Sequence, residues 1–294
     1  MTRLGLWATD PGSVAAHGGL MSSMTAVAGA AEDAGFDSLW VSEMPLDTED
    51  ASGTAGPICE AYSLLGALAA CTGSIRLGAV PLGREARLPS MLTKIVTSVD
   101  VISHGRSVLA LRLESGVDES EVIRMAEALQ VCRMMFDDES PTFSGIHYAI
   151  EGAVNRPAPV QVGGVPLVVF ADVADLSRPE VLEMAGRFAD GVVFDGDPET
   201  VGIVTEGLAG ASGSADRAED SVQVIWQASP TTGNVWSESP RRLSDQVAAQ
   251  FAAGATGILV SVAGPEQLET ITRLGSLLNE ALLSVPARTE GPAR

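Results

Sequence analysis

The feature that most constrains the fold of this chain is a regular alternation of short apolar segments with amphipathic segments, repeated eight times between Leu4 and Leu283. Several apolar segments are nearly continuous, which is typical of parallel strands buried on both faces. The amphipathic segments carry apolar residues at helical spacing, as residues 89–102 do. Eight strand–helix pairs in 294 residues predict an α/β fold, a single-domain (β/α)8 or TIM barrel, because that fold typically takes about 250 residues.

The apolar and helical patterns also set approximate element boundaries. We expect strands at residues 4–9, 38–42, 75–80, 107–113, 167–170, 191–194, 222–227 and 257–262. We expect helices at about 20–34, 59–71, 89–104, 119–136, 178–188, 240–253 and 265–283, with a sixth helix that fades into a loop near residues 210–214. Residues 137–165 form an irregular insertion between the fourth helix and the fifth strand. The barrel is predicted to span residues 1–285, and residues 286–294 are predicted to be a disordered tail.

Composition argues against several classes of function. The formal net charge of −20 argues against general binding to nucleic acid or to anionic lipid. No run of 18 apolar residues is free of charge, so no membrane span is expected. Residues 1–4 lead directly into the first strand without a secretory signal pattern, which favours a cytoplasmic location.

Residue types that bind metals are dispersed along the chain. The histidines are far apart, so no metal site is predicted: they are His17, His104 and His147. The three cysteines all fall in predicted helices and are interpreted as buried, reduced thiols: Cys59, Cys71 and Cys132. The only lysine, Lys94, lies within the third predicted helix, which argues against Schiff-base chemistry at a strand end.

Four groups of segments keep a fixed order along nearly the whole chain. They are residues 31–43; residues 72–78 with 88–106; residues 127–129, 143–148 and 157–161; and residues 189–191 with 252–257. Together they resemble the bacterial luciferase-like monooxygenase family, including its branch that depends on the deazaflavin coenzyme F-420. The resemblance implies FMN or F-420 at the carboxyl ends of the strands, and hydride transfer or monooxygenation of a small organic substrate. It also implies a homodimer, or a heterodimer with a related chain, formed through helices of the first half of the barrel.

The end of the second strand departs from the family pattern. The family often has a histidine after Ser-Glu, and this chain has Met44, which cannot exchange a proton near neutral pH. Glu43 remains as a candidate catalytic residue, with a structural hydrogen bond as the alternative. Trp40 and Ala79, on the second and third strands, are candidate cofactor contacts implied by the resemblance.

The end of the fourth strand also departs from the pattern. The family has small residues and then a long loop there, whereas this chain has Leu111, Arg112 and Leu113 and reaches the next helix almost at once. Some luciferase-like proteins hold the cofactor phosphate with an arginine at this position, and a guanidinium grips phosphate in a bidentate manner. Arg112 is therefore a candidate cofactor-binding residue. The alternative is a salt bridge from Arg112 to Glu114 or Asp172.

After the fifth strand the family usually has a Gly-Gly-x-Gly turn that offers backbone N–H groups to phosphate. Here Ser177 is predicted to cap the helix that begins at Arg178, and both are candidate cofactor-binding residues. Nearby Asp172, Asp175 and Glu180 would oppose an anion. The alternative is an ordinary capped helix whose phosphate site is lost.

Two functions of different class follow from these observations. The first is a flavin- or F-420-dependent oxidoreductase, which the resemblance along the whole chain favours. The second is a degenerate homologue with weak or no cofactor binding that acts as a structural or partner subunit, which the three departures favour. A fold by itself does not decide between them. Either way, the departures predict a cofactor affinity that is micromolar or weaker.

Overall fold

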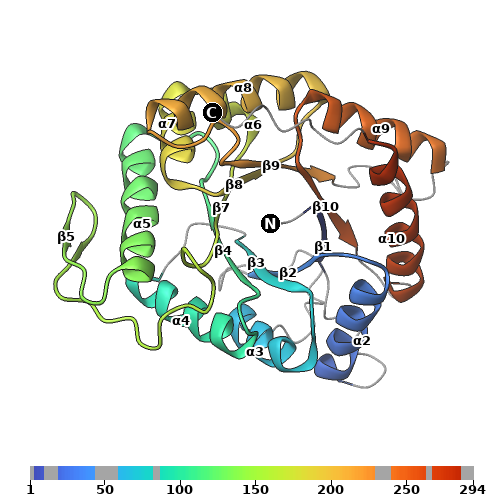
Figure 1. Ribbon diagram of the computed structural model, residues 1–294, viewed down its shortest axis with the longest axis horizontal. Coiled ribbons are helices and arrows are strands. Elements are labelled where there is room, and N and C mark those ends of the chain that lie inside the picture. Colours follow the sequence, from blue (N-terminus) through green and yellow to red (C-terminus); the bar gives the residue numbers. More distant parts are fainter. Residues whose placement is uncertain are drawn as a thin grey trace.

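A computed structural model describes residues 3–9, 19–43, 59–81, 87–228, 240–262 and 267–285 (Figure 1). Eight parallel strands close into a barrel in the order β1-β10-β9-β8-β7-β4-β3-β2, which confirms the predicted (β/α)8 fold. The barrel strands are β1 (Leu4–Ala8), β2 (Ser38–Glu43), β3 (Arg76–Pro81), β4 (Ser107–Arg112), β7 (Leu167–Phe170), β8 (Gly191–Phe194), β9 (Gln223–Ala228) and β10 (Gly257–Val262).

Helices surround the closed sheet on its outer side (Figure 1). They are α2 (Leu20–Asp33), α3 (Ala61–Cys71), α4 (Pro89–Ile102), α5 (Glu119–Asp137), α6 (Val173–Leu176), α7 (Pro179–Phe188), α8 (Pro198–Ser214), α9 (Pro240–Ala253) and α10 (Gln267–Ser284). Asp118 and Asp197 cap α5 and α8 by accepting hydrogen bonds from backbone N–H groups three residues later. Local sequence therefore fixes where these two helices begin.

Side chains alternate along each strand between the barrel interior and the layer beneath the helices. The interior is apolar and contains Trp40, Val80, Val108, Ala110, Val168, Phe170, Val193, Ile225 and Leu259, with Trp7 packed against them. The rings of Trp40 and Phe170 meet edge to face, with their centroids 5.8 Å apart. A Cβ at Gly78 would lie 2.5 Å from the Trp40 ring, so only glycine on β3 leaves room for the indole.

The insertion between α5 and β7 contains a small hairpin, β5 (Phe143–Ser144) and β6 (Ala149–Ile150). The buried carboxylate of Glu127 on α5 holds it by accepting hydrogen bonds from the backbone N–H groups of Ile146, His147 and Tyr148, at 2.6, 2.8 and 2.9 Å. A Cβ at Gly145 would lie 2.4 Å from this carboxyl group. The irregular insertion was thus predicted, and its hairpin was not.

Much of the amino-terminal face of the barrel is held by charged side chains bound to backbone. Glu32 accepts hydrogen bonds from the N–H groups of Ser74 and Ile75, just before β3. Arg106, just before β4, donates to the backbone oxygens of Ala69, Thr72, Ile75 and Ser103. Glu32 and Arg106 lie in segments that carry the family resemblance, so part of that resemblance comes from residues that hold the scaffold at the face opposite the carboxyl ends of the strands.

Several local predictions differ from the structure. Residues 210–214 were predicted as a loop but complete α8, because Ser212 is buried against α7 and its Oγ donates to the Gly186 carbonyl at 3.2 Å. The cysteine prediction was wrong for two residues, because Cys59 precedes α3 and is half-buried and Cys71 is exposed; Cys132 is buried as expected. Met44, Pro265 and residues 286–294 lie outside the described residues.

Candidate functional site

Polar side chains replace apolar ones where the strands reach the carboxyl end of the barrel. By the alternation along each strand, the last interior positions are Ser42 on β2, Arg112 on β4, Gln227 on β9 and Ser261 on β10. The Trp7 indole N–H on β1 donates to the Ser42 hydroxyl at 3.0 Å. We call this set, above the apolar interior, the mouth site. It has the position at which barrels of this class place their chemistry.

Arg112 is the cation of the mouth site. Its Nε donates to the carbonyl of Pro81 at 2.5 Å, and its guanidinium carbon lies 5.5 Å from the centre of the Phe170 ring. Burial lowers the pKa of this guanidinium, and the charge of Asp172 acts in the opposite direction. Arginine stays charged even so. Among the described residues no partner is found for either Nη, and no carboxylate lies within salt-bridge distance of Arg112. The salt bridge from Arg112 to Glu114 or Asp172 is therefore not formed.

The segment after β7 does not have the geometry of a phosphate-binding turn. Ser177 was predicted to cap a helix start, but it ends the four-residue helix α6, where its Oγ donates to the Val173 carbonyl at 2.9 Å. Arg178 is the N-cap residue of α7 without a side-chain cap. Its Nε and Nη2 donate to Glu180 at 2.8 and 2.6 Å, and its Nη1 donates to the Val117 carbonyl. Both predicted cofactor contacts are thus already engaged with protein.

The two aspartates after β7 also have protein partners. Asp172 accepts a hydrogen bond from the Ser115 hydroxyl, and the buried Asp175 accepts one from the backbone N–H of Gly116 at 3.1 Å. Together with Arg178, they fasten the short connection between β4 and α5 over the end of β7. The connection that the sequence predicted to be short is therefore tied to the region where the family offers a phosphate-binding turn.

The remaining predicted site residues lie on β2 and β3. Trp40 is buried within the barrel, and its indole N–H donates to the Ser38 hydroxyl at 3.0 Å. Ala79 is buried in the layer between strands and helices, on the face of β3 opposite to Val80. Glu43 ends β2, but its side chain lies outside what the structure describes. The predicted roles of these three residues stay predictions.

Asp195, which directly follows β8, was missed in the sequence analysis. Val193 faces the barrel interior and Phe194 faces the helices. Asp195 follows the last residue of β8, and continuing the alternation by one residue puts it on the interior side, where the residue is exposed at the end of the strand. Burial raises the pKa of its carboxyl group. A sequence signal was present, since Asp195 is the first polar residue after an otherwise apolar strand.

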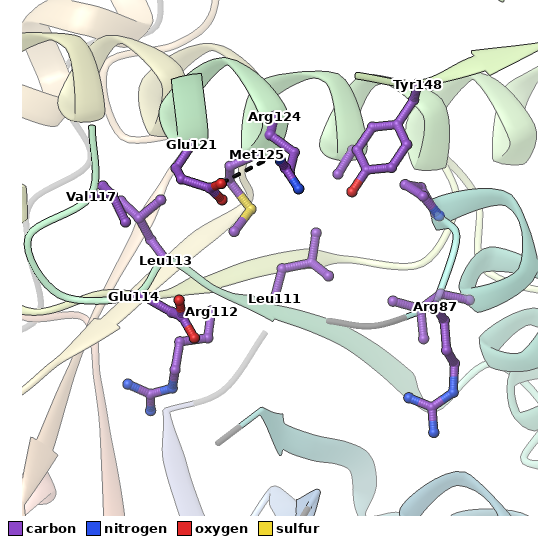
Figure 2. Close-up of a pocket in the computed structure, with 13 residues that line it drawn as sticks. Arg87, Leu111, Arg112, Leu113, Glu114, Val117, Glu121, Arg124, Met125 and Tyr148 are labelled. Atoms are coloured by element: carbon purple, nitrogen blue, oxygen red, sulfur yellow. Dashed lines mark ion pairs between the residues drawn. The ribbon is translucent and has the colours of Figure 1, made fainter. Parts of the chain in front are cut away.

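A cavity of about 500 Å³, including its open side, lies beside the barrel rather than at its mouth (Figure 2). Leu111 and Leu113 point toward α5 and line it, whereas the guanidinium of Arg112 lies on the other side of β4. An ion pair between Glu121 and Arg124, 3.3 Å apart, forms part of its rim. Arg112 is nevertheless among the residues that line this cavity, so the end of β4 borders both the cavity and the mouth site.

The described residues contain neither a metal-binding cluster nor a membrane-spanning helix. No group of three or more His, Cys, Asp or Glu side chains is arranged to hold a metal ion within that part of the chain. Among its helices, none combines the length and the apolar character needed to cross a bilayer.

A sequence model of the luciferase-like monooxygenase family matches residues 2–275, which is nearly the entire chain. The chain belongs to the luciferase-like monooxygenase family. This agrees with the order of the barrel elements and with the resemblance stated from the sequence.

Relatives of this luciferase-like protein include two whose names specify a substrate. It is 24% identical over 208 residues to the 5,10-methylenetetrahydromethanopterin reductase of Archaeoglobus fulgidus. This alignment covers 68% of this chain and 57% of the relative. It is 26% identical over 175 residues to the F-420-dependent glucose-6-phosphate dehydrogenase of Kineococcus radiotolerans, covering 55% of this chain and 49% of the relative. The chain thus spans about half the length of the curated relatives it matches.

Solved structures share the fold of this luciferase-like protein at low identity. An F-420-dependent secondary alcohol dehydrogenase in complex with an F-420–acetone adduct superposes with a TM-score of 0.75 at 15% identity, covering 95% of this chain and 99% of that one. The EDTA monooxygenase from Chelativorans superposes with a TM-score of 0.77 at 13% identity, covering 98% and 95%. At such identities the likeness extends to the fold alone.

Proposed function

We propose that this luciferase-like protein is an oxidoreductase that binds coenzyme F-420 at the mouth site and transfers hydride between it and a small organic substrate. The observation that carries the proposal is Arg112, a half-buried guanidinium at the barrel mouth whose two Nη groups have no partner among the described residues. Such a group is a ready anion-binding site. The name of the Kineococcus relative, an F-420-dependent dehydrogenase, favours the deazaflavin over FMN.

The mouth site fits such a cofactor in part. Arg112 would hold an anionic group of the cofactor, and Gln227 and Ser261 would offer polar atoms at the ends of the neighbouring strands. When bound, F-420 supplies the ring that accepts or gives the hydride. The protein supplies position and a largely apolar interior that keeps water away from the floor of the site.

The segment after β7 argues for weak binding. Ser177 and Arg178 are engaged with protein, and Asp172 and Asp175 carry negative charge near the end of β7. Each approach of a carboxylate to a phosphate at partial exposure costs on the order of 1 kcal/mol. We therefore expect a dissociation constant for F-420 that is micromolar or weaker, and a protein that purifies largely without colour.

Calorimetric titration of the purified protein with F-420 and with FMN tests the proposed function. We expect F-420 to bind more tightly than FMN, and Arg112→Ala to weaken F-420 binding by roughly 10- to 100-fold, the scale of about 1.5–3 kcal/mol for a charged hydrogen bond. Arg187→Ala is the matched control, because it removes the same charge from an exposed position on α7.

Each outcome of this titration has a defined meaning. If FMN binds more tightly than F-420, then FMN and not F-420 is the cofactor of this protein. An unchanged dissociation constant in Arg112→Ala would remove Arg112 from the site. If neither cofactor binds, the protein is better described by the alternative, a degenerate homologue that serves as a structural or partner subunit.

We also propose that the protein forms a dimer through α3 and α4. The helix α3 contains no charged residue, and it packs against α4. On and beside α4, Leu88, Met91 and Ile102 expose 64%, 57% and 48% of their surface. Exposed apolar side chains along one helix, next to a helix without charge, are typical of an association surface.

A further inference from the structure

Asp195 lies next to the interior end of β8, on the same side of the sheet as the mouth site. Phe194, the last residue of β8, pairs with Trp226 on β9, so Asp195 and Gln227 each come directly after this last pair. Asp195 comes two residues after Val193, and Gln227 comes two residues after Ile225. Val193 and Ile225 both belong to the barrel interior. The chain thus carries an exposed carboxylate and a polar amide where these two neighbouring strands reach the mouth of the barrel.

The surroundings of Asp195 leave its carboxylate without a counter-charge. In the described part of the chain it has no hydrogen-bond or ion-pair partner, although Gln227, which has contacts of its own, is its register neighbour. On β7 the nearest charged residue in register is Asp172, which is bound to Ser115. On β4 the charged group is Arg112, which contacts Pro81 and Phe170. Burial is the cause that raises the pKa of Asp195.

The described histidines lie away from the mouth site. His104 follows α4, at the amino-terminal side of β4, and His147 lies in the β5–β6 hairpin. The family position that often carries a histidine has Met44 in this sequence. The described histidines are thus not the proton-exchanging group of the mouth site, and Asp195 is a carboxylate at a neighbouring strand end with no hydrogen-bond or ion-pair partner among the described residues.

We propose that binding of an anionic cofactor at the mouth site causes the Asp195 carboxylate to take up a proton from solvent. The occupied site then holds Asp195 as a neutral carboxylic acid. A second negative charge nearby favours the protonated form of a carboxylate. In a reduction, Asp195 would give this proton to the substrate heteroatom, and the bound reduced cofactor would supply the hydride to the adjacent carbon. The inference rests on the proposed cofactor binding.

The first experiment uses the protein without cofactor. Asp195 is observed by carbon-13 NMR of protein labelled at aspartate carboxyl groups, and its signal is assigned as the one absent from Asp195→Asn. We expect its pKa to lie above the ordinary value of about 3.9, and to rise further when inorganic phosphate is added. An ordinary pKa that phosphate leaves unchanged would overturn the inference, whether or not any cofactor binds.

The second experiment measures proton uptake on binding. F-420 is titrated calorimetrically into the protein at pH 6 in two buffers with different enthalpies of ionisation. We expect the wild type to take up a larger fraction of a proton than Asp195→Asn, in which this carboxylate is absent. Because the cofactor's own ionisation is the same for both proteins, it cancels in the difference.

A matched control separates this effect from a general loss of charge. Asp197→Asn removes one carboxylate two residues away at an exposed position, and asparagine also caps a helix well. We expect it to keep the wild-type proton uptake. Binding with equal uptake in the wild type and in Asp195→Asn would overturn the inference while leaving the proposed function intact. Absence of binding would overturn the proposed function, and the NMR titration would still decide the protonation of Asp195.

Discussion

Glu127 shows how one residue fixes the position of a whole segment. Its carboxylate accepts three successive backbone N–H groups from the hairpin, and Tyr148, the third donor, lines the cavity beside β4 (Figure 2). Burial raises the pKa of Glu127, but the three hydrogen bonds outweigh it and the pKa is lowered overall. The residue thus stabilises the folded state in its ionised form.

Glu127→Gln tests this at the residue scale. We expect a loss of about 2 kcal/mol in the free energy of unfolding near neutral pH, the scale of hydrogen bonds to a charged acceptor. Since the folded pKa is below the unfolded value of about 4.3, the contribution is complete above that pH and is lost as the pH falls through the folded pKa. Urea unfolding at pH 7 and at pH 3.5 should show the difference between the two proteins shrink. A constant difference would contradict this assignment.

At the scale of elements, the barrel closes where α10 meets α2. A Cβ at Gly275 on α10 would lie 2.4 Å from the backbone oxygen of Ala34, which follows α2. Asn279, one turn later, donates to the same oxygen at 3.0 Å. Glycine at this position therefore sets how closely the first and last described helices approach each other.

Two helical glycines should respond to alanine in opposite ways. Gly275→Ala should destabilise the protein by about 1–3 kcal/mol, because the clash is with backbone that cannot rotate away. Gly210→Ala on α8 should stabilise it by about 0.5–1 kcal/mol, because a Cβ there meets nothing within 4 Å. Thermal unfolding of both variants checks the pair. A stabilising Gly275→Ala would show that the helix contact is looser than described.

At the scale of the whole molecule, the proposed dimer has a direct test. Light scattering of the 30.3 kDa chain at micromolar concentration should give a mass near twice that value. Met91→Glu should shift the protein to monomer, because it places a charge in the apolar surface of α4. Ile203→Glu, on α8, changes an equally exposed apolar residue on another side of the barrel and should leave the mass unchanged. A wild-type protein of 30 kDa would contradict the proposed assembly.

Sequence by itself determined the order of the elements. The periods of the apolar residues identified eight strand–helix pairs, and the predicted bounds of α9 and β10 coincide with those in the structure. The start of a helix such as α5 could be predicted from the sequence because a capping residue bonds to backbone only three residues away, as Asp118 does to the N–H of Glu121. The family was also recognisable from ordered segments along the chain, two of which contain Glu32 and Arg106, whose side chains bind backbone at the amino-terminal face.

Tertiary structure decided what the polar residues near the mouth do. The sequence placed Arg112, Asp172 and Arg178 at strand ends, but which of them is engaged with protein depends on contacts between segments about 60 residues apart. Likewise, the position of Asp195 next to the mouth site depends on the pairing of β8 with β9, which ends one residue earlier, at Phe194 and Trp226. Local propensity reports on neighbours within one turn or one strand, whereas the partner of a charge and the burial that shifts its pKa are fixed only when the barrel closes.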